Sequence, residues 1–472
     1  MKVICDKSLP FADCELALLR NAVDKAENIK GFKMANSEEI KSIISIVEKF
    51  IKRNSLICYG GTAINNILPK ADQFYDLRSE IPDYDFLSPM AVDHAKNLAD
   101  IYVKMGYTEV EAKAGQHFGT YKVFVNYIPI ADITQINDRM YRSLKKEAIK
   151  KDNLLYLPPN MLRMSMYLEL SRPAGDISRW EKVLKRLTLL NKHYPLSAKN
   201  CDYHFFTRKM EQGENTDHLF KVIRNSLVNS NVVFFGGYAS NVFAQYMSKD
   251  TRKSIHHYPD FDVLSEHAEE TANALKDVLI VNKYDNVSIV KHENVDEYIP
   301  THYEVKINKD TVVFIYQTIA CYSYNVITVD HQKTNIATID TMLSLLLAFI
   351  YANKPYYDNE RILCMANFLF KIQQKNRLSQ KGALKRFNIQ CFGTQATKES
   401  IRAEKSDKYE ELKDKRDTKE YELWFLNYKP DSKSVKTKSK SKKITRKNKP
   451  KPSKSKKTTK NNIQKLLKPL LS

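Results

Sequence analysis

Apolar and polar positions along the 472-residue chain follow one pattern twice. Each copy opens with a short apolar strand that ends in Gly-Gly, at 56–59 and again at 232–235. In the first copy a segment with apolar residues at helical spacing follows, including Ala63, Ile64 and Ile67. The pattern therefore predicts two related units that combine strands and helices.

Further along each copy, a proline precedes two aspartates that flank an aromatic residue. The stretch "IPDYDFLSP" holds Asp83 and Asp85, and "YPDFDVLSE" repeats the arrangement with Asp260 and Asp262. Because residues i and i+2 of a strand point to the same side, each pair presents two carboxylates on one face. Each copy contains four matching blocks, among them the Gly-Gly strand and this aspartate pair, and the blocks occur in the same order. We therefore interpret the chain as a duplicated domain.

The expected fold class is α/β (α+β), with two tandem units that are each a mixed sheet with helices followed by a helical segment. We expect domain limits of 1–195 for the first unit, 196–430 for the second and 431–472 for a tail. A helix is predicted over 37–52, with Ser37 as its N-cap and Glu38 and Glu39 in its first turn, and another over about 90–105.

The formal charge of +21 is concentrated in the tail. The segment 432–460 contains 14 Lys or Arg residues and no acid, which leaves +7 for the rest. This composition predicts a disordered tail, because it offers almost nothing apolar to bury. By contrast, 43% hydrophobic and 11% aromatic residues predict a globular body.

Cysteine usage and hydropathy predict whether the protein is intracellular, secreted or membrane-bound. The seven cysteines include no C-x-x-C pair, so we expect reduced thiols and neither a disulfide framework nor a zinc site. No apolar run at the start indicates a signal peptide. The most apolar run, "TMLSLLLAFIYA", is too short to span a bilayer and predicts a buried helix. A soluble intracellular protein without membrane contact is expected.

A third acid completes a candidate metal site in the first copy. Asp132 stands alone in the apolar strand "YIPIADIT", where an unpaired carboxylate is costly. With Asp83 and Asp85 it offers the oxygen ligands that Mg²⁺ or Mn²⁺ prefers, and two ions are expected. The structural alternatives are turn or strand-cap aspartates and, for Asp132, a salt-bridged acid.

The Gly-Gly turn predicts a phosphate site. Gly60 and Gly61 lie between a strand and a helix, where free N–H groups and the helix dipole favour an anion. Thr62 offers a hydroxyl to the same anion. A tight turn without phosphate is the alternative.

The second copy keeps its Gly-Gly turn and its aspartate pair but lacks the third acid. An ungapped match puts Tyr316 at the position of Asp132 and pairs Glu304 with Thr120. We therefore expect this copy to have lost the chemistry, with RNA binding or a subunit contact as remaining roles.

These motifs resemble a known family. "YGGTAINNIL", "PDYDFLSP" and "ADIT" match the pattern of polymerase-beta-like nucleotidyltransferases, and "YLELSRPAGDISRWEKVLKRLTLLN" is similar to the helical block of poly(A) polymerase catalytic subunits of large cytoplasmic DNA viruses. The similarity is greatest to giant-virus (mimivirus-type) members, more distant to the poxvirus enzyme, and covers about 40–375. It implies template-independent addition of AMP from ATP to mRNA 3′ ends.

The resemblance also implies roles for the metal-binding residues. Asp83 and Asp85 would coordinate both metal ions, and Asp132 would share the ion that activates the RNA 3′-hydroxyl.

Further roles concern the triphosphate. Gly60, Gly61 and Thr62 would hold it, although the family often has Ser in place of Thr62. Arg179 and Lys182 would contact its β- and γ-phosphates, with a solvated helix face as their alternative.

Expected partners follow from the same resemblance. They are RNA, ATP, a second copy in a homodimer, and a cap-methyltransferase or the transcription machinery. The expected location is the viral factory in the host cytoplasm, with packaging in the virion as an open question. For the tail, RNA binding stands beside nuclear targeting, solubility and contact with packaged nucleic acid. Alternatives for the whole chain are a uridylyl-, CCA- or oligoadenylate-type transferase, or a non-catalytic RNA-binding scaffold.

Overall fold

The strands of the described part of the chain form two mixed sheets of eight strands each. The computed structural model describes residues 10–76, 81–199, 201, 206–208, 210, 216–247, 258–376 and 378–430. The tail predicted over 431–472 lies outside the described residues.

The first sheet contains, in spatial order, β16 (Asn427–Tyr428), β3 (Val110–Ala114), β4 (Thr120–Val125), β5 (Ile128–Gln135), β2 (Tyr84–Ser88), β1 (Ile57–Cys58), β7 (Leu154–Tyr156) and β6 (Ile149–Lys151). The second contains β10 (Val287–His292), β11 (His302–Ile307), β12 (Asp310–Gln317), β9 (Phe261–Ser265), β8 (Val233–Phe235), β14 (Gln332–Ala337), β13 (Tyr322–Val329) and β15 (Cys391–Phe392).

The two sheets share one topology. The order β3-β4-β5-β2-β1-β7-β6 of the first corresponds strand for strand to β10-β11-β12-β9-β8-β14-β13 of the second. In both, the strand before Gly-Gly pairs antiparallel with the strand of the acid pair, which pairs parallel with the next. The duplication and the α/β fold class predicted from the sequence are confirmed.

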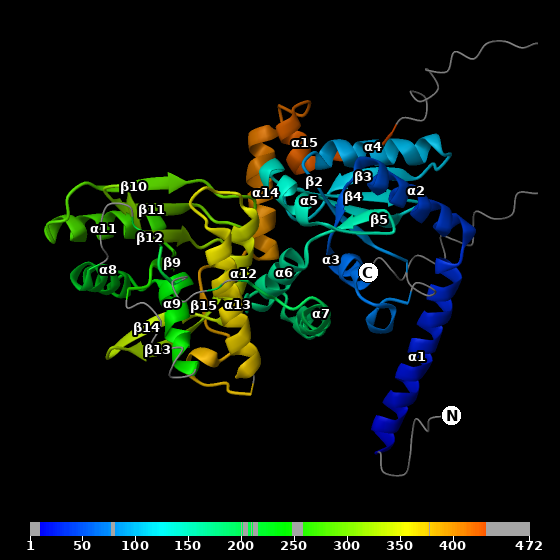
Figure 1. Ribbon diagram of the computed structural model, residues 1–472. Coiled ribbons are helices and arrows are strands. Elements are labelled where there is room, and N and C mark those ends of the chain that lie inside the picture. Colours follow the sequence, from blue (N-terminus) through cyan, green and yellow to red (C-terminus); the bar gives the residue numbers. More distant parts are fainter. Residues whose placement is uncertain are drawn as a thin grey trace, which may run out of the picture. The chain divides into compact units, whose positions relative to one another are not determined.

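The longer helices are α1 (Phe11–Ala35), α2 (Glu38–Asn54), α3 (Gly60–Ile67), α4 (Ala91–Lys104), α5 (Asp138–Glu147), α6 (Pro159–Leu170), α7 (Trp180–His193), α8 (Asp217–Asn229), α9 (Gly236–Phe243), α11 (Ala268–Val281), α12 (Ile339–Tyr351), α13 (Asn359–Lys375), α14 (Lys398–Leu412) and α15 (Lys419–Phe425). Short 3-10 turns are η1 (Lys70–Asp72), η2 (Ile177–Arg179), η4 (Ala244–Tyr246) and η5 (Gly382–Leu384). Helices α4 and α11 cover equivalent strands of the two sheets (Figure 1). The helices predicted over 37–52 and 90–105 correspond to α2 and α4.

Helix α12 is the most apolar of the described helices. Every residue from Ile339 to Tyr351 is buried, including the polar Asp340, Thr341 and Ser344, and the burial predicted from the apolar run is confirmed. It packs on α6 and α13, so it contacts the helices that follow both sheets. Within the described part of the chain, no helix is long and apolar enough to cross a membrane.

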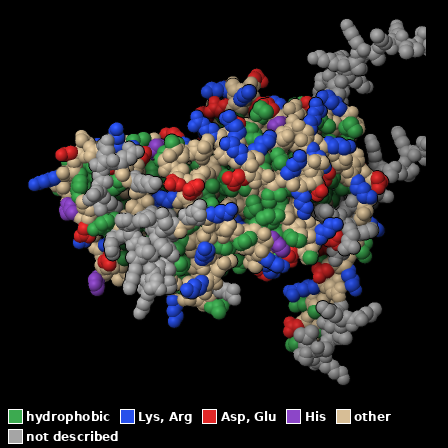
Figure 2. Space-filling view, in the orientation of Figure 1, with side chains coloured by type: hydrophobic (Ala, Val, Ile, Leu, Met, Phe, Trp, Pro, Cys, Tyr) green, Lys and Arg blue, Asp and Glu red, His purple; other side chains and the backbone are tan. Residues whose placement is uncertain are grey.

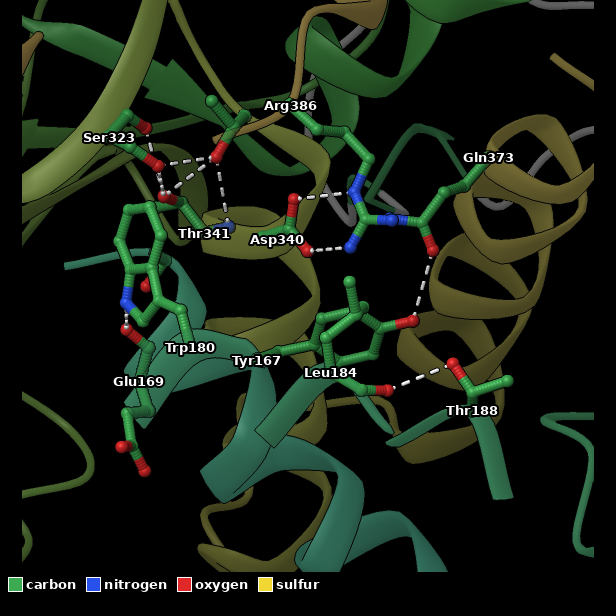
Figure 3. A network of polar contacts seen from close by, with 12 residues as sticks. Tyr167, Glu169, Trp180, Leu184, Thr188, Ser323, Asp340, Thr341, Gln373 and Arg386 are labelled. Carbon is green, nitrogen blue, oxygen red and sulfur yellow. Dashed lines mark hydrogen bonds and ion pairs between the residues drawn. The ribbon is translucent and has the colours of Figure 1, made fainter. Parts of the chain in front are cut away.

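Polar contacts also stabilise the packing of α6, α12 and α13 (Figure 3). The Tyr167 hydroxyl on α6 donates to Gln373 Oε1 on α13 at 3.1 Å. Asp340, only 1% exposed on α12, accepts two hydrogen bonds from Arg386, at 3.0 and 2.6 Å. A bidentate pair satisfies both carboxylate oxygens, which makes the burial of the charge tolerable.

After the second sheet the chain returns to the first. Strand β16 pairs with β3, and Lys96 Nζ lies 2.5 Å from Glu422 Oε1. The Tyr121 hydroxyl donates to the carbonyl of Leu423 at 2.8 Å. The predicted range 196–430 for the second domain therefore includes a segment that completes the first sheet.

The prediction of reduced thiols was wrong for five of the described cysteines, since Cys14 is also disulfide-bonded. Disulfides join Cys201 to Cys364 and Cys321 to Cys391, with Cα–Cα distances of 5.6 and 5.2 Å. Each pair is brought together from positions far apart in the sequence, which spacing alone does not reveal. Among the described cysteines, Cys58 is free and buried.

Charges are interspersed on the body of the protein. On the face drawn in Figure 2, Lys and Arg side chains lie among Asp and Glu side chains. This agrees with the modest excess of +7 outside 432–460.

Candidate active site

The three acids of the first copy converge at one edge of the sheet. Strands β2 and β5 are parallel neighbours, and Asp85 is the register partner of Asp132. Adjacent strands lie about 4.8 Å apart, so these two carboxylates are close. Asp83 lies directly before β2, close enough that its charge, like that of Asp132, acts on the pKa of Asp85. The predicted convergence of the three carboxylates is therefore what the register produces.

Burial and neighbouring negative charge raise the pKa of two of the carboxylates. Burial, followed by the charges of Asp83 and Asp132, raises the pKa of Asp85 to about 8. Desolvation by surrounding atoms and the charge of Asp132 also raise the pKa of Asp83, although Asp83 is exposed as a whole residue. Negative charges that disfavour the ionised forms of Asp83 and Asp85 favour a bound cation.

One lysine compensates this negative charge in part. Lys122 Nζ on β4 lies 2.5 Å from Asp132 Oδ2. The other oxygen, Asp132 Oδ1, is buried without a hydrogen-bond partner. An unpartnered buried carboxylate oxygen fits a metal ion as its missing partner.

The side chains alone do not enclose a metal. Among the described residues, no group of three His, Cys, Asp or Glu side chains is arranged around one point as a finished metal site. Mg²⁺ usually takes one or two carboxylates and completes its shell with waters and substrate phosphates. The donor set of Asp83, Asp85 and Asp132 fits such an open site.

The Gly-Gly elbow packs directly on the acids. Gly60 has φ +72°, and a Cβ atom there would overlap Asp85 Oδ2. Glycine is thus required both for the backbone conformation and for the close approach. The N–H of Tyr59 donates to the Asp85 carbonyl at 2.9 Å, which fixes the elbow against β2.

Thr62 makes a contact that the sequence did not predict. Its hydroxyl donates to the main-chain carbonyl of Asp83 at 2.7 Å. The side chain thereby links the start of α3 to the first acid. Its contact with a phosphate remains a prediction.

Arg179 is the N-cap residue of α7, and Lys182 lies in the first turn of that helix. Arg179 Nε is 3.0 Å from Glu169 Oε1, and its charge lowers the pKa of Asp85. Lys182 is exposed one turn further on. The Trp180 indole N–H donates to the Glu169 carbonyl at 3.0 Å and anchors this helix start (Figure 3).

Arg186 and Tyr75 are site residues that the sequence analysis missed. Arg186 Nη2 donates to the Tyr75 hydroxyl at 2.7 Å, and its guanidinium lies 4.7 Å from the centre of the Phe74 ring. A Cβ on Gly61 would overlap the Tyr75 hydroxyl and lie 2.9 Å from Arg186 Nη1. The cation therefore lies over the helix N-terminus where a phosphate is expected. The spacing of four from Lys182 could have indicated it, because both residues then share a helix face.

The second copy neutralises its acid pair with arginines. Arg208 Nε lies 3.1 Å from Asp260 Oδ2, and Arg208 also bonds Asp262. Arg361 on α13 pairs with Asp260 as well. These guanidinium groups neutralise the charge of the pair, although Asp260 Oδ1, like Asp132 Oδ1, is buried without a hydrogen-bond partner.

The predicted counterpart of Asp132 was wrong by two residues. Phe314, not Tyr316, is the register partner of Asp262, and Glu304 faces Phe314 as Lys122 faces Asp132. The hairpin turns at 126–127 and 308–309 set this alignment. The position is still not acidic.

The chain is similar in sequence to known proteins. Residues 45–176 match the profile of the family described as "Poly(A) polymerase catalytic subunit". The chain is 25% identical over 413 residues to a protein of Acanthamoeba polyphaga mimivirus named as a poly(A) polymerase catalytic subunit, covering 75% of this chain and 67% of that protein. It is 31% identical over 196 residues to the protein of that name from African swine fever virus (isolate Tick/Malawi/Lil 20-1/1983), covering 40% of this chain and 39% of the relative.

A solved structure also matches. The crystal structure of the Megavirus polyadenylate synthase superposes with a TM-score of 0.72 at 21% identity, covering 87% of this chain and 86% of the other. This likeness establishes the shared fold. The resemblance to viral poly(A) polymerase catalytic subunits that the motifs predict is confirmed.

Proposed function

We propose that this relative of the viral poly(A) polymerase catalytic subunits is a template-independent polynucleotide adenylyltransferase that adds AMP from ATP to RNA 3′ ends. The observation that carries the proposal is the convergence of Asp83, Asp85 and Asp132 beside the Gly60 elbow. The site lies within the segment that matches the family profile.

In this reaction the RNA 3′-hydroxyl oxygen forms a bond to the α-phosphorus of ATP. The bond from that phosphorus to the bridging oxygen of the β-phosphate breaks, and pyrophosphate leaves. Two bound Mg²⁺ or Mn²⁺ ions would supply charge neutralisation at the attacking and leaving oxygens. Asp83 and Asp85 would hold both ions and Asp132 one of them. The unpartnered oxygen of Asp132 and the raised pKa of Asp85 support this donor set.

The chain's own groups position the nucleotide. The N–H groups at the start of α3 and the Arg186 guanidinium face the same space, which suits the triphosphate. Thr62 holds Asp83 in place through its carbonyl. Arg179 and Lys182 remain candidates for the outer phosphates; Arg179 would exchange Glu169 for phosphate.

The second copy is proposed to be non-catalytic. Asp260 and Asp262 are paired with Arg208 and Arg361, and Phe314 stands where a third acid is needed. Such a pair is already neutralised and has little affinity for a divalent cation.

Partners follow from the viral relatives and from charge. We propose RNA and ATP as substrates, a homodimer as the assembly, and action in the viral factory of the host cytoplasm. A cap-methylating partner, contact with the transcription machinery and packaging in the virion are further hypotheses. The Lys-rich segment 432–460 would retain RNA through phosphate contacts.

A primer-extension assay tests the function. The full chain is incubated with an RNA primer, Mg²⁺ or Mn²⁺, and each nucleoside triphosphate in turn. Extension with ATP alone is expected. Preferred incorporation of UTP or CTP would identify another transferase, and no incorporation of any nucleotide would favour a scaffold.

A further inference from the structure

A cavity of about 510 Å³ lies in the second copy, beside the carboxylates that correspond to the catalytic pair. Arg208, Asp262 and Phe314 form its inner end, and the start of α13 forms one wall. Its size is within the range of about 300–1,000 Å³ that small-molecule sites occupy. The duplication has thus left an opening where the first copy has its candidate active site.

The contents of this cavity exclude a catalytic metal centre of the kind proposed for the first copy. Arg208 and Asp262 have side chains that are 16% and 6% exposed and are paired with each other. Asp260 is shared by Arg208 and Arg361. Because two partly buried arginines and two buried aspartates already form a neutral cluster, a divalent cation would have to displace a guanidinium group.

The triphosphate elbow is also closed in the second copy. A Cβ on Gly237 would overlap both Asp260 Oδ1 and the carbonyl oxygen of Phe206. In the second copy the main chain at Phe206 therefore fills the space beside Gly237. In the first copy the corresponding space beside Gly61 is approached only by the ends of the Arg186 and Tyr75 side chains. A ligand of this cavity cannot be held as ATP is expected to be held in the first copy.

The walls suit a planar ring. Tyr356 and Tyr357 line the cavity and are half-buried. Phe314 lies behind them, with the Arg208 guanidinium 4.6 Å from its ring centre. Aromatic faces of this kind bind bases by stacking, whatever the base.

The charges suit a ligand with a single phosphate. The basic side chains that line the cavity are Lys199, Arg208, Lys309 and Arg361. The acidic ones are Asp262, Asp310, Asp358 and Glu360. A formally neutral lining disfavours a triphosphate, whereas the exposed Lys309 offers one phosphate contact and the exposed Glu360 offers an acceptor for a ribose hydroxyl.

We propose that this cavity is a non-catalytic binding site for one nucleoside monophosphate unit of single-stranded RNA, with its base on Tyr356 and its phosphate at Lys309. The assignment of RNA as the source rests on the proposed function; a free nucleoside monophosphate has the same chemistry. The disulfide between Cys201 and Cys364 holds the segment that carries Lys199 against α13, so the wall is covalently fixed.

Binding of a fluorescent oligo(A) to the full chain tests this site. Fluorescence anisotropy is measured without ATP or divalent cations, for Tyr356→Ala, Lys309→Ala and, as a control for charge, Lys333→Ala, an exposed lysine outside the cavity. Tyr356→Ala should weaken binding roughly 5- to 100-fold, as loss of one stacked base does. Lys309→Ala should weaken it less, and Lys333→Ala least.

Two further measurements determine whether the bound nucleotide belongs to RNA or is free, and show whether a loss of binding is caused by misfolding of the variant. AMP is titrated by calorimetry, and wild-type protein is photocrosslinked to RNA that contains 8-azidoadenosine, with the peptides mapped by mass spectrometry. Loss of both oligo(A) and AMP binding in Tyr356→Ala supports a nucleotide site, and loss for oligo(A) alone assigns the site to the RNA chain. Equal affinities in all variants, with no crosslink within 349–365, would overturn the proposal.

The test is independent of catalysis. It is repeated in the Asp83→Ala background, in which the proposed catalytic site is disabled. Oligo(A) binding that depends on Tyr356 should persist there. If the chain binds oligo(A) through Tyr356 but incorporates no nucleotide, the proposed function fails while this inference stands.

Discussion

Asp85 and Asp132 are register partners on adjacent parallel strands, although 46 residues separate them in the chain. The corresponding partner of Asp262 is Phe314. One sheet edge therefore carries three carboxylates, and its duplicate carries two carboxylates that arginines neutralise. This difference is the basis for proposing metal-dependent chemistry in the first half and none in the second.

Removing one acid of the second pair should cost stability. Asp262→Ala leaves Arg208, 16% exposed, with one ion-pair partner fewer. Breaking a buried pair in this way destabilises a protein by about 3 kcal/mol. Urea unfolding of the variant is compared with Asp277→Ala, which removes an exposed acid on α11. Equal stability of the two variants would contradict the buried cluster.

Local signals in the sequence identified the elements of the site. The Gly-Gly elbow and the aspartate pair were predictable because each depends on a few consecutive residues. The register of the third strand was not, since it depends on the lengths of two loops. The turn residues Asn126 and Asn308, with φ values of 51° and 56°, mark the equivalent hairpins and give the correct match.

Other parts of the site depend on contacts that no spacing reveals. Arg186 on α7 contacts Gly61, which lies more than 120 positions earlier in the sequence. Arg208 contacts Asp260 and Asp262 although it lies more than 50 positions before them. The disulfides, which the sequence analysis did not predict, also join distant segments. Such contacts follow from tertiary packing alone.

Arg186 should act on ATP binding. Arg186→Ala removes a guanidinium that faces the helix start beside Gly61, so we expect KM for ATP to rise roughly 10- to 100-fold, as loss of a charge-assisted hydrogen bond does. Steady-state kinetics with Lys185→Ala, an exposed lysine paired with Glu181, gives the control. Arg186→Lys should recover part of the loss. An unchanged KM would limit Arg186 to a structural contact with Tyr75.

The buried His302 should make folding depend on pH. Burial lowers the pKa of His302 from its ordinary 6.5 to about 4, and its Nε2 lies 3.0 Å from the Tyr356 hydroxyl. The unfolded chain binds this proton below pH 6.5 and the folded chain only near 4. Stability should therefore fall as pH decreases through this window.

The measurement compares unfolding midpoints from pH 7 to about 4. His302→Gln should show a smaller decrease than wild type, whatever its stability at pH 7. An identical pH dependence would show that His302 titrates alike in both states.

The tail should act on processivity rather than chemistry. Deletion of 431–472 removes the 14 basic residues of 432–460, which would release counterions when they contact phosphates. We expect shorter products from the truncated chain at moderate salt, with a similar rate of first addition. Product length is measured on denaturing gels across a salt series. Unchanged lengths would assign the tail to targeting or solubility.

The most direct test of the account is the single-turnover rate of AMP addition by Asp83→Ala, Asp85→Ala and Asp132→Ala, with Asp260→Ala as the matched control. Losing a metal-binding carboxylate should lower the rate by roughly 10³-fold or more. The control should retain activity, because its acid is already paired with arginines. Near wild-type rates in the first three variants, or loss of activity in a folded Asp260→Ala protein alone, would contradict the assignment of the active site.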